Sequence, residues 1–118
     1  MEQVLVMEQR DLLLVPFPFS DQSGRKVRPV IVISNNKFNR NSEDLIVVGV
    51  TSNISKGEYS INLTNKDLEE GKLLSNCCIK VENVLKIEKE LIIKKIGRIN
   101  KKVLEHIVLK LLDILKED

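Results

Sequence analysis

Short apolar runs separated by polar segments fill most of the chain up to residue 99. Val30–Ile33 and Leu45–Val50 are uninterrupted apolar runs, a pattern typical of strands that are covered on both faces. Asp11–Phe17 is also β-like until Pro16 and Pro18, residues that suit a strand end or a sheet edge. Tyr59–Leu63 alternates between apolar and polar residues and predicts a half-exposed strand. These runs predict a sheet made of short strands.

The later apolar segments continue this pattern. Cys77–Val81 and Val84–Ile87 are either two strands or one strand with a bulge around Glu82 and Asn83. Leu91–Ile99 is expected to be the last strand, with a bend at its glycine.

Two polar segments separate these strands. The asparagine-rich segment Asn35–Ser42 is expected to form a turn. Asn65–Gly71 is expected to form one short helical turn closed by its glycine.

The final segment has a different periodicity. Apolar residues recur there at three- and four-residue spacing, which predicts an amphipathic helix, and Asn100 is a suitable N-cap. The pattern therefore predicts a mainly β fold with one α-helix: a small, strongly curved antiparallel barrel with the C-terminal helix packed on it. The expected buried stripe of the helix is Val103, Leu104, Ile107, Val108, Leu111, Leu112 and Leu115.

Length and charge narrow the possible functions. A chain of 118 residues suits a single domain with one core. The net charge is only +2 and no strongly basic arm is present, so a contact with nucleic acid has to come from a local patch. One candidate is the loop between the first two strands, which carries Arg25 and Lys26 and leads into Arg28.

Several other classes of function find no support in the sequence. No apolar run approaches the ~20 residues of a membrane span and no signal-peptide pattern is present, so we expect a cytoplasmic protein without membrane contact. The adjacent Cys77 and Cys78 point to opposite faces of a strand, which favours buried, reduced thiols. No metal-ligand spacing or cofactor motif appears, so no metal and no cofactor are expected. His106, the only histidine, falls outside the apolar stripe and is expected on the surface.

Five stretches in this order resemble the MazF/PemK family of bacterial and archaeal toxin endoribonucleases. They cover nearly the whole chain after residue 9, which gives a short extension over 1–9 and a single toxin domain over 10–118. The stretches are Asp11–Phe19 (DLLLVPFPF), Arg28–Ser34 (RPVIVIS), Val47–Ser52 (VVGVTS), Cys78–Ile87 and Ile96–Leu115.

The resemblance implies both a fold and an activity. The fold is an SH3-like barrel of the CcdB/MazF type that forms a symmetric homodimer. The activity is metal-independent cleavage of single-stranded RNA, chiefly messenger RNA, within short sequence motifs, which inhibits translation. The resemblance also implies a cognate antitoxin partner that blocks the RNA groove.

The same resemblance assigns roles to individual residues. The arginine and threonine that match the family's catalytic pair are Arg28 and Thr51, and Ser52 is a candidate phosphate contact. Without the resemblance, Arg28 is interpreted as pairing with Asp21 or Glu43, and Thr51 as an ordinary strand-end threonine that bonds to backbone. Asp21 and Glu82 are candidates for the general base by residue type alone. The RNA-binding candidates are Ser52, Arg25, Lys26, Asp21, Glu82, Asn83 and Lys86.

Three departures from the family pattern keep an alternative open. Arg10 stands where the family usually has glycine, Cys77 where it often has serine, and Leu85 where it often has an arginine that contacts RNA. The alternative is a non-catalytic binding protein on the same barrel, either a CcdB-like toxin directed at gyrase or a degenerate RNA binder. A later basic cluster is either an RNA or antitoxin contact or a solvated face; it comprises Lys94, Lys95, Arg98, Lys101 and Lys102.

Overall fold

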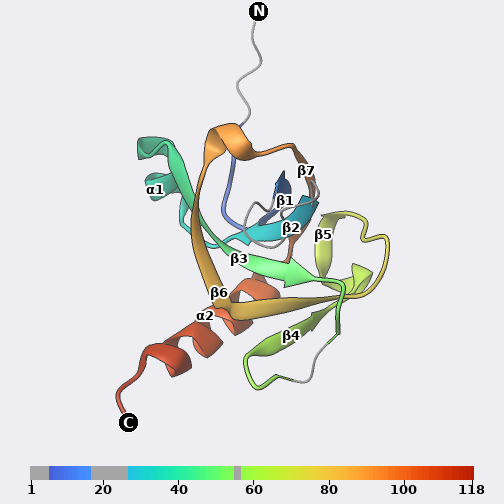
Figure 1. Cartoon of the computed structure of the whole chain (residues 1–118), viewed down its shortest axis with the longest axis vertical. Helices are drawn as coiled ribbons and strands as arrows, with labels where there is room; N and C mark the ends of the chain where they lie inside the picture. The colour runs from blue at the N-terminus through green and yellow to red at the C-terminus, as the bar shows by residue number, and fades with distance from the viewer. Residues whose placement is uncertain (1–5, 17–26, 55–56) are drawn as a thin grey trace, which may run out of the picture.

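A single antiparallel sheet, curled into a half-barrel, dominates the computed structural model, which describes residues 6–16, 27–54 and 57–118 (Figure 1). In the described part of the chain the sheet has seven strands in the order β4-β6-β3-β2-β1-β7-β5. The strands are β1 (Asp11–Pro16), β2 (Val27–Val32), β3 (Asp44–Thr51), β4 (Ser60–Leu63), β5 (Leu68–Gly71), β6 (Cys77–Glu88) and β7 (Lys94–Ile99); the helices are α1 (Asn36–Asn41) and α2 (Lys101–Leu115).

The curled sheet and C-terminal helix confirm the predicted fold class. Of the two possibilities for the segment after Cys77, the structure shows one continuous strand, β6, interrupted by a bulge. The last strand begins at Lys94 and not at Leu91, because a short 3-10 turn over Lys89–Leu91 precedes it. Pro16 is the final residue of β1, where its missing N–H interrupts no further pairing.

The expectation of a turn at Asn35–Ser42 is wrong, because this segment forms helix α1. The side chain of Asn35 caps the helix by accepting a hydrogen bond from the backbone N–H of Phe38 at 2.8 Å. Asn39 is buried, and its amide nitrogen donates to the carbonyl oxygen of Ser34 at 2.9 Å. Asparagine therefore caps and anchors a short helix here.

The segment Asn65–Gly71 also differs in part from its expectation. A 3-10 turn over Asn65–Asp67 is present, but Leu68–Gly71 continues as strand β5 at the sheet edge. Gly71 has a φ of +85°, and a Cβ atom there would lie 2.2 Å from the carbonyl oxygen of Ile96. The glycine is therefore required by a left-handed backbone and by the close approach of β7.

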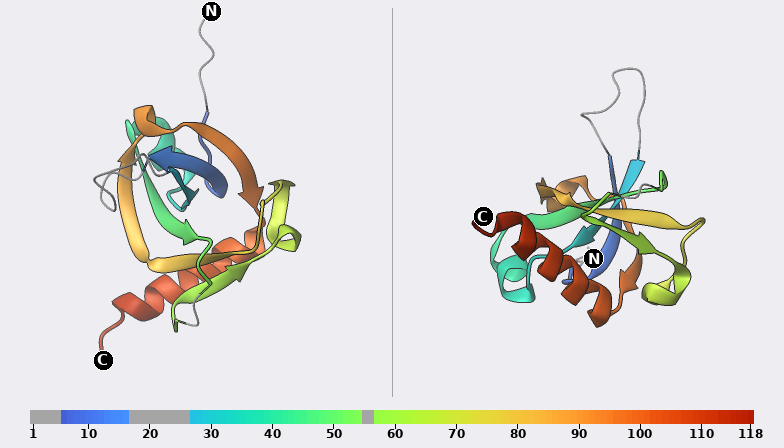
Figure 2. Two further views of the ribbon diagram at one scale, coloured as in Figure 1. Left: turned by 45° about the vertical axis from the view of Figure 1, so that its right-hand side comes forward. Right: turned by 90° about the horizontal axis from the view of Figure 1, so that it is seen from below.

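Apolar side chains cover both faces of the sheet. Helix α2 lies across one face, where Val103 and Ile107 pack into the larger cluster (Figure 2). Asn100 caps the helix as expected, accepting from the backbone N–H of Val103 at 2.9 Å. Part of the expected stripe, Val108, Leu112 and Leu115, is nevertheless exposed, whereas Leu104, Leu111 and Ile114 are partly buried against the cluster. The sheet therefore covers a narrower side of the helix than the apolar pattern suggests.

A buried carboxylate organises the junction of β1, β7 and β5. Asp11 is fully buried, and Arg98 donates from Nε to its Oδ1 at 3.1 Å, while Lys95 Nζ lies 3.3 Å from the same oxygen. Arg98 also pairs with Glu8 at 3.1 Å, and Lys95 pairs with Glu70 at 3.1 Å. Two members of the later basic cluster therefore neutralise carboxylates of the fold.

Arg10 adopts the backbone conformation that glycine favours, with a φ of 80°. Its backbone N–H donates to the carbonyl oxygen of Val32 at 2.8 Å, and its own carbonyl oxygen accepts from the N–H of Ile99 at 2.9 Å. Its side chain donates to the Ile99 carbonyl oxygen at 3.0 Å and pairs with Glu69 at 3.1 Å. These contacts hold an arginine at a position where the family that the chain resembles usually has glycine.

The cysteines and the histidine lie where the sequence predicted. Cys77 and Cys78 are buried and unbridged, and burial raises the pKa of the Cys77 thiol, which keeps it protonated. His106 is exposed on α2. Within the described residues, neither helix is long and apolar enough to cross a bilayer.

Candidate RNA-cleavage site

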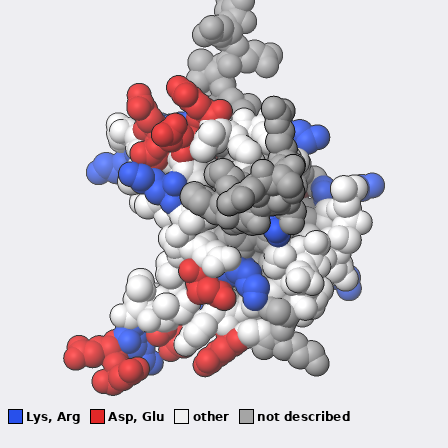
Figure 3. Space-filling model, viewed as in Figure 1, with Lys and Arg blue, Asp and Glu red and all other residues white. Residues whose placement is uncertain are grey.

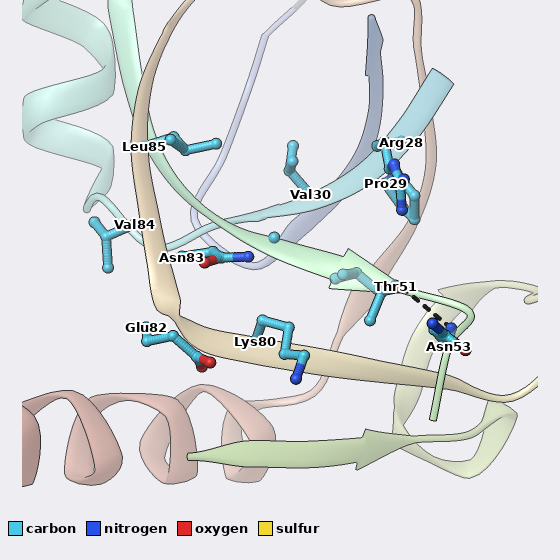
Figure 4. A pocket seen from close by; sticks show the side chains of 12 residues that line it. Arg28, Pro29, Val30, Thr51, Asn53, Lys80, Glu82, Asn83, Val84 and Leu85 are labelled. Carbon is cyan, nitrogen blue, oxygen red and sulfur yellow. Dashed lines mark hydrogen bonds between the residues drawn. The ribbon is translucent and has the colours of Figure 1, made fainter. Parts of the chain in front are cut away.

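A cleft of about 610 Å³ opens over strands β2, β3 and β6 (Figure 4). Strand β3 forms its centre, with β2 on one side and β6 on the other, as the strand order requires. The residues that line the cleft are Arg28, Pro29, Val30, Gly49, Val50, Thr51, Asn53, Lys80, Glu82, Asn83, Val84 and Leu85.

The pairing of β2 with β3 brings Arg28 and Thr51 to the same end of this cleft. Val30 pairs with Gly49, and continuing this antiparallel register by two residues places Arg28 opposite Thr51. Residues opposite each other in an antiparallel pair project to the same face of the sheet. Both side chains line the cleft and are half-buried, so the scaffold holds them while leaving their polar ends accessible.

The backbone just after β3 orients the Thr51 hydroxyl. Asn53 donates its backbone N–H to Thr51 Oγ1 at 3.1 Å, the bond drawn in Figure 4. A hydroxyl that accepts this bond still carries its own proton, which it can donate to a phosphate oxygen. Thr51 is therefore a preorganised donor in the cleft that Arg28 also lines.

A bulge in β6 forms the opposite wall. Val48 of β3 pairs with Val84, whereas the next residue, Gly49, pairs with Lys80, so β6 holds extra residues at this point. Such a bulge bends its strand, and Figure 4 shows β6 turning sharply at Glu82. The bend presents the exposed side chains of Glu82 and Asn83 to the cleft.

The floor of the cleft is largely apolar. Val30 is buried, and Leu85 packs against the same cluster on this face of the sheet. Leu85 occupies the position where the resembling family often carries arginine, so this chain replaces a charge with an apolar surface. Such a surface suits the face of an unstacked base.

The structure brings together some of the predicted site residues and not others. Arg28, Thr51, Glu82 and Asn83 line one cleft, while the exposed Ser52 follows Thr51 without being among the lining residues. Lys86 is exposed and also outside the lining set, with its Nζ 3.8 Å from Asp44 Oδ2. The candidates Asp21, Arg25 and Lys26, and the aromatic residues Phe17 and Phe19, lie outside the described residues.

The sequence interpretation missed two residues of the cleft, Lys80 and Asn53. A signal for Lys80 was present, since it is the one charged residue in the otherwise apolar run Cys77–Val81. Asn53 carried no comparable signal, because polar residues are ordinary after a strand.

The described residues that line the cleft carry more positive than negative charge. Arg28 and Lys80 contribute two cations to the lining and Glu82 contributes one anion. Acidic side chains gather instead at the turn after β6 and near the C-terminal end of α2 (Figure 3). In the described ranges no three histidine, cysteine, aspartate or glutamate side chains gather closely enough to hold a metal ion.

Comparisons with solved structures support the fold. The MazE-MazF complex from Deinococcus radiodurans (Form-II) superposes with a TM-score of 0.78 at 17% identity, over 95% of this chain and 97% of that chain. An endoribonuclease in complex with its cognate antitoxin from Mycobacterial species gives 0.75 at 16% identity, over 92% and 94%. The Mycobacterium tuberculosis toxin MazF-mt6 gives 0.74 at 13% identity, over 92% and 99%.

Sequence comparison identifies the family. No curated protein sequence matches the chain. The family model for the PemK-like, MazF-like toxin of type II toxin-antitoxin systems, however, matches residues 8–115, which is nearly all of the domain described above. The chain therefore belongs to the PemK-like, MazF-like toxin family of type II toxin-antitoxin systems.

Proposed function

We propose that this toxin is a metal-independent endoribonuclease that cleaves single-stranded RNA, chiefly messenger RNA, within short sequence motifs and so inhibits translation. The observation that carries the proposal is the pairing of β2 with β3, which sets Arg28 and Thr51 on one face at the end of an open cleft. Its substrate would place its site of action in the cytoplasm.

RNA supplies its own nucleophile for this reaction. The 2′-oxygen attacks the adjacent phosphorus and the bond from phosphorus to the 5′-oxygen breaks, leaving a 2′,3′-cyclic phosphate and a free 5′-hydroxyl. The 2′-hydroxyl gives its proton to a base, and the leaving 5′-oxygen receives one. The enzyme therefore has to align the 2′-oxygen and stabilise the charge on the phosphoryl oxygens.

Arg28 and Thr51 fit the second task. The planar guanidinium of Arg28 meets two phosphoryl oxygens at once and can donate a proton toward the leaving oxygen, while the Thr51 hydroxyl fixes the same phosphate. Arginine is a poor base, because its pKa lies above ~12. Glu82 is the carboxylate that the described part of the cleft offers for the base role.

The proposed partner is a cognate antitoxin that covers the cleft. Two of the similar structures are described as complexes, one of MazE with MazF and one of an endoribonuclease with its cognate antitoxin. An antitoxin that occupies the surface between β2 and β6 would exclude RNA from Arg28 and Thr51. Adding the purified antitoxin should therefore stop cleavage.

We also propose a symmetric homodimer, supported by the exposed apolar residues of α2. Leu109, Leu112 and Leu115 are 65%, 58% and 71% exposed, although they belong to an amphipathic helix. Asp113 and Lys116 flank them with opposite charges. A copy related by a two-fold axis could therefore place Asp113 of each subunit against Lys116 of the other. Light scattering after chromatography should show a dimer that L112E converts to a monomer, whereas the exposed E105A leaves it intact.

The test of the activity is incubation of the purified protein with long single-stranded RNA in EDTA, followed by mapping of the cut ends. We expect discrete cuts that bear cyclic phosphate. Arg28→Ala and Thr51→Ala should each reduce the rate on the order of 100- to 1,000-fold, the usual cost of removing one preorganised donor. Arg40→Ala, on the exposed end of α1, is the matched control and should cut at the wild-type rate.

Two outcomes would contradict the proposal. Equal cleavage rates for wild type, Arg28→Ala and Thr51→Ala would show that these two residues do not carry out catalysis. Intact RNA, both with a long transcript and with total cellular RNA, would favour the non-catalytic alternatives, a gyrase-directed toxin or an RNA binder on the same barrel.

A further inference from the structure

Lys80 is a second cation in the cleft that the mechanism above does not use. It lies on β6, where it pairs with Gly49 of β3 on one side and with Ser60 of β4 on the other. The backbone of Lys80 is therefore paired with a neighbouring strand on each side. Its side chain is half-buried and lines the cleft together with Arg28 and Thr51.

The strand order fixes where Lys80 lies relative to Arg28. The two residues are on β6 and β2, one strand away from β3 on either side. Arg28 lies level with Thr51, whereas Lys80 lies level with Gly49, two residues back along β3. Strands are about 4.8 Å apart and rise about 3.3 Å per residue, so the two Cα atoms are separated diagonally by roughly 12 Å.

Two long side chains at this separation reach toward different points in one cleft. A guanidinium and an ammonium that extend from opposite walls could both approach the single phosphate that Thr51 is proposed to contact. They can, however, hold two successive phosphates of one extended strand that crosses β3 diagonally. Gly49 lies on that path and lines the cleft, with the side chain of Asn83 beside it.

We propose that Lys80 binds a phosphate next to the scissile one and so sets the path of single-stranded RNA across β3. This inference rests on the proposed function, because it assumes that the cleft takes RNA. Lysine provides a compact point charge on a flexible stem, which suits a non-scissile phosphate whose geometry need not be fixed as tightly as that at Arg28.

A purely structural role explains Lys80 less well. The neighbouring residues Ile79 and Val81 point into the core and are fully buried, so they already anchor this part of β6. An apolar residue at position 80 would continue the apolar floor formed by Val30 and Leu85. A lysine instead buries its aliphatic stem along this floor while its ammonium remains available at the cleft.

The salt dependence of RNA binding tests this contact directly. The probe is a fluorescein-labelled 12-nucleotide RNA pool of random sequence, with every 2′-oxygen methylated so that it cannot be cut. Its affinity is measured by fluorescence anisotropy over a range of salt concentrations for wild type, K80M, K80R and K37M. Met keeps the aliphatic stem of lysine, Arg keeps the charge, and Lys37 is an exposed lysine of α1 outside the cleft.

Loss of one phosphate contact should reduce the slope of log K against log salt by about 0.7, the value for single strands. We expect this reduction in K80M, with K80R and K37M retaining the wild-type slope. On an RNA that wild type cleaves, K80M should raise KM roughly tenfold with little change in kcat, because the contact exists before the transition state.

A wild-type slope in K80M, an equal loss in K37M, or failure of wild type to bind the probe would each overturn the inference. The proposed function fails separately. If wild type binds the probe with the Lys80-dependent slope but cuts no RNA, Lys80 remains a phosphate contact of a binding protein. If wild type cuts RNA and K80M keeps its slope, the nuclease stands and the Lys80 assignment is wrong.

Discussion

The side chain of Asn83 lies against Gly49, so that a Cβ atom built on Gly49 would be 3.4 Å from Asn83 Cβ and 3.7 Å from its amide nitrogen. Gly49 is in the middle of β3 and Asn83 is in the bulge of β6, so the Asn83 side chain packs beside the centre of β3 within the cleft. A larger residue at position 49 would have to displace Asn83.

Gly49→Val should therefore impair the site more than the fold. Valine suits a strand, but its methyl groups would push Asn83 and occupy the path of the RNA. Displacement of about 1 Å in a site of this kind can cost on the order of 100-fold in rate. Gly49→Ala, whose single methyl group is just accommodated, is the matched control and should retain most activity. Cleavage assays together with thermal melting would separate the two effects; a melt that collapses in Gly49→Val would show a folding role instead.

Replacing Asp11 should destabilise the fold strongly. Asp11 is fully buried between Arg98 and Lys95, and its removal leaves these cations with only the more exposed Glu8 and Glu70 as partners and the Glu8 N–H without its acceptor. We expect Asp11→Ala to lower the free energy of unfolding by about 3 kcal/mol, measured by urea denaturation. Glu69→Ala, which removes the half-exposed carboxylate beside Arg10, should cost less than about 1 kcal/mol. Equal losses in the two variants would contradict this ranking.

The left-handed backbone of Arg10 predicts an unusual order of stability. Arg10→Ala and Arg10→Gly both lose the contacts with Glu69 and with the Ile99 carbonyl, so they differ mainly in backbone strain at a φ of 80°. Arg10→Gly should be more stable than Arg10→Ala by about 1 kcal/mol. Urea denaturation of the pair provides the measurement, and an alanine variant as stable as the glycine variant would argue against strain.

The pair formed by Lys95 and Glu70 predicts a pH dependence. The hydrogen bond and the charge of Lys95 hold the pKa of the Glu70 carboxyl below its ordinary value. A lowered folded-state pKa contributes stability that is fully present above the unfolded value of about 4.3 and is lost as pH falls through the folded value. The stability difference between wild type and Glu70→Gln should therefore be constant near neutrality and shrink below about pH 4.

Lys95→Met provides the control for that titration, because it removes the partner that lowers the pKa. In its background, Glu70→Gln should have a smaller pH-dependent effect, because only the charges of Arg98 and Arg10 still lower the pKa of the Glu70 carboxyl. A difference that instead grows as pH falls would have the wrong sign for this mechanism.

The two cysteines should be unreactive in the native protein. Both are buried, and the raised pKa of Cys77 keeps its thiol in the protonated, unreactive form near neutral pH. Titration with an aromatic disulfide reagent should detect almost no thiol before denaturation and two thiols after it. Rapid labelling without denaturant would indicate that the strand of Cys77 and Cys78 opens readily.

Local pattern predicted those features that depend on neighbours in the chain. Apolar runs gave the strands around Val30–Ile33 and Leu45–Val50, because a strand buried on both faces needs apolar side chains on both. Asn100 indicated the start of α2, because the first N–H groups of a helix have no partner within the helix and can donate to a short polar side chain. The order of motifs indicated Arg28 and Thr51 as candidates before their strands were placed side by side.

Tertiary structure alone decided which of these residues meet. The register of β2 with β3 brings Arg28 toward Thr51, and the bulge in β6 turns Glu82 and Asn83 into the same cleft. Periodicity predicted a buried stripe through Leu112, yet this residue is exposed while Leu111 and Ile114 pack against the core, because periodicity marks an apolar face without fixing which side of it the sheet covers.

The same distinction applies to charged residues. In the sequence, Lys80 is a lone charge in an apolar strand and Arg98 is one member of a basic run. Only the packing of strands far apart in the chain sends Lys80 into the cleft and Arg98 to Asp11, 87 positions away. A sequence determines which segments can bury apolar surface, whereas the partners of its charges depend on long-range pairings that local patterns do not encode.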